Sequence, residues 1–191
     1  MKDEPSADVS LAGAWLLNED LSDDPSQAMD QMRGGGPGAD GGGPAARPGG
    51  FGGRDGGGRM GGRRGGRPSE DPQELRELLR SATTPPSRLT ITQTDDAVTF
   101  TEPDGRTATF TINGKTERHQ FDNHVVETRT KWKGGQLVKE IRLPHGLKIV
   151  ETYSLAHESR MLQVNVKVEG SRMPRSISLR RFYDAVDPLG R

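Results

Sequence analysis

Cysteine is absent from the 191-residue chain, and aromatic residues and long apolar runs are scarce. The lack of cysteine excludes disulfides, thiolate nucleophiles, iron–sulfur clusters and cysteine-based zinc sites. A membrane-spanning helix needs about 20 predominantly apolar residues, and the apolar runs here are only a few residues long. The 27 basic and 27 acidic residues balance, so the net charge gives no argument for a nucleic acid or an anionic membrane as a partner.

The balanced charge conceals a strong segregation along the chain. Residues 1–32 carry one Lys and eight acidic residues, a net charge of −7, whereas residues 33–67 carry seven Arg and two Asp, a net charge of +5. Attraction between the two segments would be weak if both are solvated, because salt screens exposed charges. Two solvated segments that barely touch fit the pattern equally well.

Glycine and arginine dominate residues 34–68, where Phe51 is the one aromatic residue. Such a segment cannot bury enough apolar area to offset its chain entropy, so we predict a disordered loop. The segment resembles the arginine–glycine segments of RNA-binding proteins, which contact phosphates and stack on bases. RNA or another anionic partner is therefore an alternative function, although one Phe supplies little stacking and a flexible connector explains the composition as well. The contacting residues would be Arg54, Arg59, Arg63, Arg64 and Arg67.

A short helix is predicted over residues 69–82. Ser69 or Asp71 can cap it, and a proline follows at the first helical position. Leu75, Leu78 and Leu79 form one apolar stripe along it. A helix this short is marginal in isolation, so it must dock on another part of the protein.

From Leu89 onward, apolar and polar residues alternate, which is typical of half-buried strands. Turn sequences such as Asn113-Gly114 separate the runs at intervals too short for crossover helices, so neighbouring strands should be antiparallel. Strands are predicted at residues 10–17, 89–94, 97–102, 106–112, 116–121, 124–132, 136–143, 147–155, 161–168 and 175–184.

These strands predict an all-β fold, an antiparallel meander over residues 88–186 that closes into a barrel of about 8–10 strands, since closure removes exposed edges. The strand at 10–17 lies in an acidic segment, residues 10–33, and would complete the barrel. The Gly/Arg-rich segment and the helix then form one insertion after the first strand. Residues 1–9 are predicted to be disordered.

Gly13-Ala-Trp15 on a first strand resembles the Gly-x-Trp motif of the lipocalins and their relatives, the calycins. The resemblance implies that Gly13 and Trp15 belong to the closed floor of the barrel, and that an arginine of the last strand covers the Trp ring by cation–π contact. Arg181 shares a strand face with apolar residues and suits that role, but the lipocalin Thr-Asp-x-Arg motif is absent. The chain also resembles uncharacterised exported bacterial proteins through Trp15-Leu-Leu-Asn18 and Lys131-Trp-Lys-Gly134.

The resemblance to carrier barrels implies a non-enzymatic protein that binds a small apolar or amphipathic molecule. In lipocalins and fatty-acid-binding proteins the connection after the first strand covers the open mouth, so the helix at 69–82 would be a lid. Docking of its leucines in a notch on the outside of the barrel is the equally weighted alternative.

Trp132, Glu151 and Tyr153 are the candidate ligand contacts, because they lie on otherwise apolar strand faces. Glu151 could instead lie at the rim and Tyr153 in the core. Barrels of this size can be filled by side chains, so a ligand-free structural or interaction barrel is a further alternative.

The sequence offers no catalytic constellation. It has no Gly-x-Ser-x-Gly elbow, and its four histidines are scattered over hairpins. His119, Asp122 and His124 are the one compact trio of metal-ligand types, but they straddle a turn and lack a fourth ligand. We therefore expect neither an enzyme nor a bound metal or other cofactor.

Localisation is an indirect expectation. The start Met-Lys-Asp-Glu-Pro lacks the hydrophobic region of a signal peptide. The resemblance to exported proteins predicts export, with the signal peptide missing from this sequence; if Met1 is the native start, the protein is cytoplasmic.

Overall fold

The computed structural model describes residues 9–32, 72–121, 124–156, 160–171, 173 and 175–186. The disorder predicted for residues 34–68 and for the first eight residues lies outside these ranges, as does the predicted anionic-partner contact at Arg54, Arg59, Arg63, Arg64 and Arg67.

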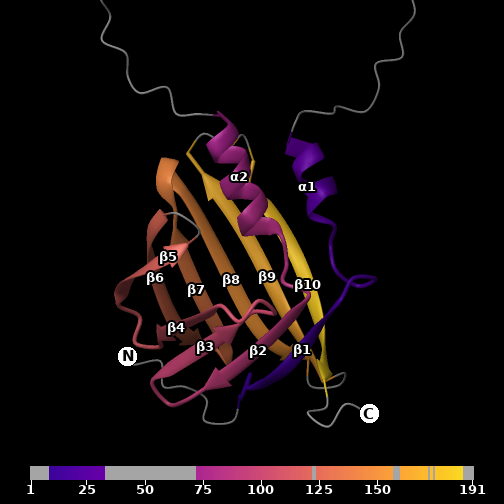
Figure 1. Ribbon diagram of the computed structural model, residues 1–191, viewed down its shortest axis with the longest axis vertical. Helices are drawn as coiled ribbons and strands as arrows, with labels where there is room; N and C mark the ends of the chain where they lie inside the picture. The colour runs from indigo at the N-terminus through magenta and orange to yellow at the C-terminus, as the bar shows by residue number, and fades with distance from the viewer. Residues whose placement is uncertain are drawn as a thin grey trace, which may run out of the picture.

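Ten antiparallel strands form a single sheet that curls into a nearly closed barrel (Figure 1). The strand order is β4-β3-β2-β1-β10-β9-β8-β7-β6-β5, so every neighbouring pair is hydrogen-bonded and the two end strands are β4 and β5. The predicted all-β antiparallel barrel is therefore confirmed. The strands are β1 Gly13–Asn18, β2 Arg88–Gln93, β3 Ala97–Thr101, β4 Thr107–Thr111, β5 Thr116–Phe121, β6 His124–Lys133, β7 Gln136–Arg142, β8 Leu147–Ala156, β9 Met161–Gly170 and β10 Ile177–Val186.

The first strand joins the two halves of the sheet. Trp15 lies opposite Leu89 of β2 on one side and opposite Ala185 of β10 on the other. Everything between β1 and β2 is consequently one insertion, which leaves the barrel after Asn18 and returns at Arg88.

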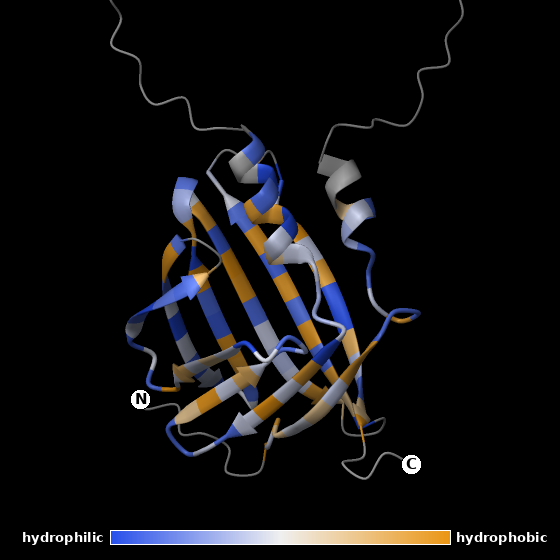
Figure 2. Ribbon diagram, viewed as in Figure 1, coloured by the Kyte–Doolittle hydropathy of each residue, from blue (hydrophilic) through white to orange (hydrophobic). Residues whose placement is uncertain are grey.

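Side-chain alternation divides each strand between the interior and solvent, as the bands along the ribbons in Figure 2 show. On β9, four alternate apolar residues are almost fully buried, namely Leu162, Val164, Val166 and Val168. Full burial of one such side chain contributes about 1.5–3 kcal/mol. The repeated alternation therefore supplies most of the core.

The turn between β6 and β7 is set by glycine. Gly134 and Gly135 both have positive φ angles, +56° and +76°. A two-residue hairpin turn of type I′ needs positive φ at both central residues, which glycine adopts without steric cost.

A second helix is the main departure from the predicted elements. The sequence predicted one helix, but α1 also forms over Pro25–Met32. Asp24 caps it, since its Oδ1 accepts the N–H of Ser26 at 2.7 Å, and Pro25 occupies the first turn. Asp23 joins this region to β10, because its Oδ2 accepts the backbone N–H of Arg180 at 2.8 Å.

Helix α2 spans Pro72–Thr83 and lies with α1 at one end of the barrel (Figure 1). Leu78, Leu79 and Ala82 are buried and belong to the same hydrophobic core as the barrel strands. The face of α2 that carries these three residues thus lies against the barrel, while Arg76, Glu77 and Arg80 are exposed. A short 3-10 turn, Pro144–Gly146, connects β7 and β8.

Candidate ligand-binding site

Three charged side chains meet inside the barrel. Lys139 on β7 lies directly opposite Glu151 on β8, and Arg181 projects from β10. The Lys139 Nζ is 2.6 Å from Glu151 Oε2, and the two side chains are only 10% and 12% exposed. Arg181 is also buried. Charges this deep are costly unless other groups replace their lost water.

Aromatic rings surround the Lys139 ammonium. Its Nζ lies 4.8 Å from the ring centroids of Phe100 and Phe110 and 5.6 Å from that of Tyr153. These distances are within cation–π range. The hydroxyl of Tyr153 donates to Glu151 Oε2 at 2.7 Å. Glu151 therefore accepts from both neighbours, and the ammonium is held between a carboxylate and three rings.

Arg181 reaches the end of α2. Its Nη2 donates to the backbone oxygens of Thr83 at 2.8 Å and Ala82 at 3.3 Å. The last carbonyls of a helix lack partners within the helix and carry partial negative charge, so a guanidinium satisfies them well. The Nε of the same guanidinium is buried and has no hydrogen-bond partner among the described residues.

This geometry corrects the role that the lipocalin resemblance implied for Arg181. Trp15 pairs with Ala185, four residues along β10 from Arg181, and its ring Nε1 donates to the oxygen of Leu11 at 3.0 Å. Trp15 is buried as expected, but Arg181 binds the helix rather than covering the Trp15 ring. Gly13 has φ near +155°, and a Cβ at this position would lie about 3.5 Å from the ring of Trp15.

The electrostatics leave one positive charge in excess. Burial alone would raise the pKa of Glu151, but the charges of Lys139 and Arg181 and the hydrogen bonds from Lys139 and Tyr153 hold it below its ordinary value of 4.5. Burial, followed by the Glu151 charge, raises the pKa of Tyr153 well above 10. Burial raises the pKa of Tyr183 to about 12 against the opposing charge of Arg181. Among the described residues of this cluster, Lys139 and Arg181 therefore supply two positive charges against the one negative charge of Glu151, with both phenols neutral at neutral pH.

Two hydroxyls beside the charged cluster also lack partners. Thr128 and Thr130 point inward from β6, and the Oγ1 of each is buried with no hydrogen bond in the described structure. Thr130 lies directly opposite Lys139 in the ladder. A buried polar group left without a partner costs about 1–3 kcal/mol, so the interior has donor capacity that its own residues do not use.

The structure brings two of the three predicted ligand contacts together. Glu151 and Tyr153 are hydrogen-bonded, whereas Trp132 is half-buried on β6 and separated from Tyr153 by Leu137 in the same ladder row. Sequence reasoning missed Lys139. Its signal was its position between Leu137 and Ile141, which places it on the inward face of β7.

Two hollows, about 620 and 380 Å³ in volume, lie on the outer face of the sheet. Val150, Thr152 and Lys167 line both, and these positions alternate along their strands with the inward ones. The hollows are thus separated from the charged cluster by the thickness of the sheet. The cluster itself is packed by side chains, so a ligand that reaches it must displace some of them.

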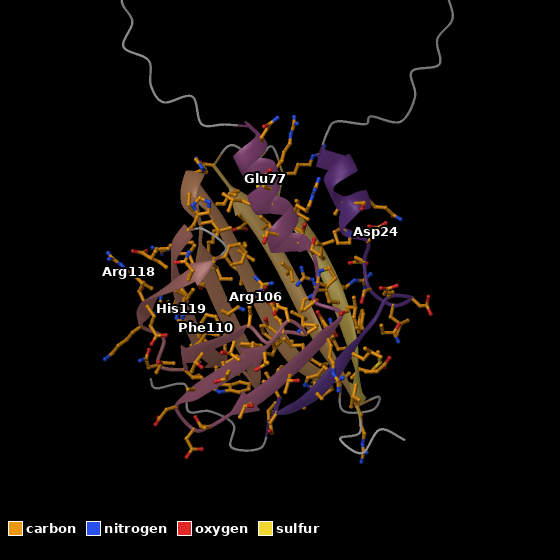
Figure 3. The ribbon with its side chains drawn as sticks, in the orientation of Figure 1. Asp24, Glu77, Arg106, Phe110, Arg118 and His119 are labelled. Atoms are coloured by element: carbon orange, nitrogen blue, oxygen red, sulfur yellow. The ribbon has the colours of Figure 1, made fainter. Side chains whose placement is uncertain are left out.

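Side chains bridge the two end strands of the sheet. The rings of Phe110 on β4 and His119 on β5 lie 4.5 Å apart, and Figure 3 shows them side by side while Arg118 points away. Glu117 Oε2 accepts the backbone N–H of Thr111 at 3.1 Å and lies 3.3 Å from His119 Nε2. This contact connects β4 to β5 in place of a ladder.

The candidate metal trio lies only partly in the described part of the chain, which includes His119 and His124. Asp122 lies outside it, and His119 is engaged by Phe110 and Glu117. Across the described ranges, no group of three or more His, Asp or Glu residues could hold a metal ion. Neither α1 nor α2, over the residues described, is long and apolar enough to cross a membrane.

Comparison with known proteins gives a likeness of structure alone. No protein-family model and no curated sequence matches the chain. Lipid binding protein 8 of Caenorhabditis elegans superposes with a TM-score of 0.52 at 15% identity, covering 94% of this chain and all of that one. The fold is similar to that of the fatty-acid-binding proteins.

Two further structures support that likeness. Fatty-acid-binding protein 1 of Echinococcus granulosus has a TM-score of 0.50 at 12% identity, covering 93% of this chain and 98% of its own. The REP1-NXSQ fatty acid transporter has a TM-score of 0.50 at 15% identity, with coverages of 93% and 96%. The expected calycin-like barrel is thereby supported, whereas the resemblance to exported bacterial proteins stays a prediction.

Proposed function

We propose that the protein is a non-enzymatic carrier that binds a small amphipathic molecule with an anionic head group inside the barrel. One observation carries the proposal: Arg181 is an excess cation in the interior, and its Nε has no partner among the residues that the structure describes. A carboxylate at that position would balance the buried charge and accept the unused N–H. Charge-assisted bonds from a guanidinium to a carboxylate are among the strongest in proteins.

The surroundings suit the rest of such a molecule. The unpartnered hydroxyls of Thr128 and Thr130 supply further donors, and the apolar rows of β9 and β10 flank the cluster. Ligand sites of this type combine apolar walls with a few convergent polar groups. The similar structures include proteins named for binding fatty acids and lipids, which adds support for the same ligand class.

Entry would take place at the end covered by α2. Leu78, Leu79 and Ala82 fill that end of the barrel, so an apolar tail can replace them only if the helix shifts. The exchange conserves apolar burial, because the tail takes the place of the leucines against the same strands.

Native mass spectrometry of the gently purified protein tests the proposal first. We expect a discrete added mass of a few hundred daltons that organic extraction removes. The stripped protein should then bind oleate, measured by displacement of a fluorescent fatty acid, and bind methyl oleate at least about 10-fold more weakly, because the ester lacks the charge that Arg181 would bind.

Two variants locate the site. Arg181→Met should abolish the preference for oleate over its methyl ester. Arg180→Met is the matched control, since it removes a cation one residue away that points outward to Asp23. Failure of the stripped protein to bind oleate would contradict the carrier proposal. Nucleotide adducts in the native spectrum would instead favour the anionic-partner role predicted for the arginine-rich segment.

A further inference from the structure

We infer that Arg181 holds the C-terminal end of α2 through the carbonyls of Ala82 and Thr83, and that an anionic ligand releases the helix by binding the same guanidinium. We call this contact the latch. The inference rests on the proposed function and adds how binding controls the helix that covers the site. In the structure as it stands, the helix itself occupies the guanidinium.

The fork geometry of arginine makes the helix and the ligand compete. Nε–H and the adjacent N–H of Nη2 form one edge of the guanidinium, and a carboxylate grips that edge with both oxygens. At Arg181, Nη2 is used by the carbonyls of Thr83 and Ala82, whereas Nε is buried and unpartnered. Nη2 has two N–H groups and donates to two carbonyls, so a carboxylate that takes the Nε edge competes with the helix for one of these N–H groups.

The protein's own carboxylate makes no hydrogen bond to the Nε of Arg181 in the described structure. Glu151 Oε2 already accepts from Lys139 at 2.6 Å and from Tyr153 at 2.7 Å. Lys139 thus neutralises Glu151 and leaves Arg181 available to the helix. The latch stays closed until an external anion arrives.

The contact at stake holds the last turn of α2. That turn is otherwise closed by hydrogen bonds to the carbonyl oxygens of Leu79 and Arg80, from the hydroxyl of Thr83 and the backbone N–H of Thr84. Once Nη2 moves to the ligand, the carbonyls of Ala82 and Thr83 lose a charged donor in a buried setting. The end of α2 should then open more often, which frees Leu78 and Leu79 to leave the barrel mouth.

Hydrogen exchange with mass spectrometry on the full chain tests the latch. Oleate at saturation should speed exchange in the peptide covering residues 79–87 by about 5- to 10-fold, because a stabilising contact is lost from that turn. Methyl oleate at saturation has the same tail without the charge, so it should speed exchange in that peptide clearly less than oleate does, because Arg181 then keeps its contact with the helix carbonyls. The comparison of the two ligands on the wild-type protein decides the question without any variant.

Two arginine variants test whether the change in exchange depends on Arg181. Arg181→Met should show fast exchange in the same peptide with and without oleate, whereas Arg180→Met should behave as the wild type. Oleate binding with unchanged or slower exchange at residues 79–87 would overturn the latch and leave the carrier proposal intact. A lack of oleate binding would overturn both.

Discussion

The buried charge cluster predicts that loss of Glu151 destabilises the protein more than loss of Lys139. Glu151→Gln leaves Lys139 and Arg181 as two interior cations with no anion. Lys139→Met leaves one cation and one anion, with the Tyr153 hydroxyl still donating to Glu151. The two substitutions break the same 2.6 Å ion pair, yet they should differ in cost because of the charges that remain.

The free-energy cost of each substitution depends on the charges and rings that remain around the site. Breaking a buried pair by removing one partner costs about 3–5 kcal/mol, and Glu151→Gln should fall in that range. Lys139→Met should cost about 1–2 kcal/mol, because Met packs well against the rings of Phe100 and Phe110 and the remaining charges offset each other. For a protein of this size, about 1 kcal/mol shifts the melting temperature by about 2–4 °C.

Urea denaturation followed by tryptophan fluorescence measures these differences. The Lys139→Met/Glu151→Gln double variant should cost less than the sum of the single changes, since it removes both members of the pair. Lys148→Met is the control, because Lys148 pairs with Glu140 across the same two strands on the outer face, 39% and 25% exposed, and should cost below about 1 kcal/mol. Equal destabilisation by Lys139→Met and Glu151→Gln, or a Glu151→Gln cost that matches the control, would contradict an excess of positive charge in the interior.

Three further measurements test other parts of the structure. Trp15→Ala should destabilise the protein by about 3–5 kcal/mol, because the side chain is 6% exposed. Trp15→Phe should cost only about 1–2 kcal/mol, through loss of the hydrogen bond to Leu11. A loss below about 1 kcal/mol for Trp15→Ala would contradict the burial of Trp15. Tyr153 and Tyr183 are the only tyrosines, and both pKa values are raised, so absorbance at about 295 nm should show little phenolate at about pH 10.5. Stability should then fall above pH 10, where only the unfolded chain ionises; a normal midpoint near 10 in the folded protein would refute this. The lowered pKa of Glu151 contributes stability above the ordinary value of 4.5 that is lost as pH falls below it, so the urea midpoint should drop less between pH 6 and 3 in Glu151→Gln than in the wild type.

The strands could be predicted because the sequence signal of each strand is local. Alternation and turn residues placed all ten within a few positions, since half-buried strands need a two-residue period whatever their partners are. Helix α1 was missed because it is only eight residues long and four of them are polar, although Asp24-Pro25 was a usable start signal.

The site could be predicted only in part, because its contacts join residues far apart in sequence. Lys139 was overlooked since a charged residue is rarely buried. Arg181 was recognised as an inward charge in need of a partner, but the partner lies 98 positions away, at Thr83 of α2. Which group meets that guanidinium depends on register and helix placement, which strand periodicity does not specify.

The two end strands, β4 and β5, meet without a row of backbone hydrogen bonds between them, and we call this junction the seam. Between every other pair of neighbours, separation would break rows of backbone hydrogen bonds. Here the strands are joined by Glu117, by the Phe110–His119 ring contact and by their connecting turn, in which the N–H of Gly114 donates to the oxygen of Thr130 at 2.9 Å. Separation at this seam would therefore break side-chain contacts and no row of backbone hydrogen bonds. A change in the circumference of the barrel at this seam would leave the register of the nine hydrogen-bonded junctions intact.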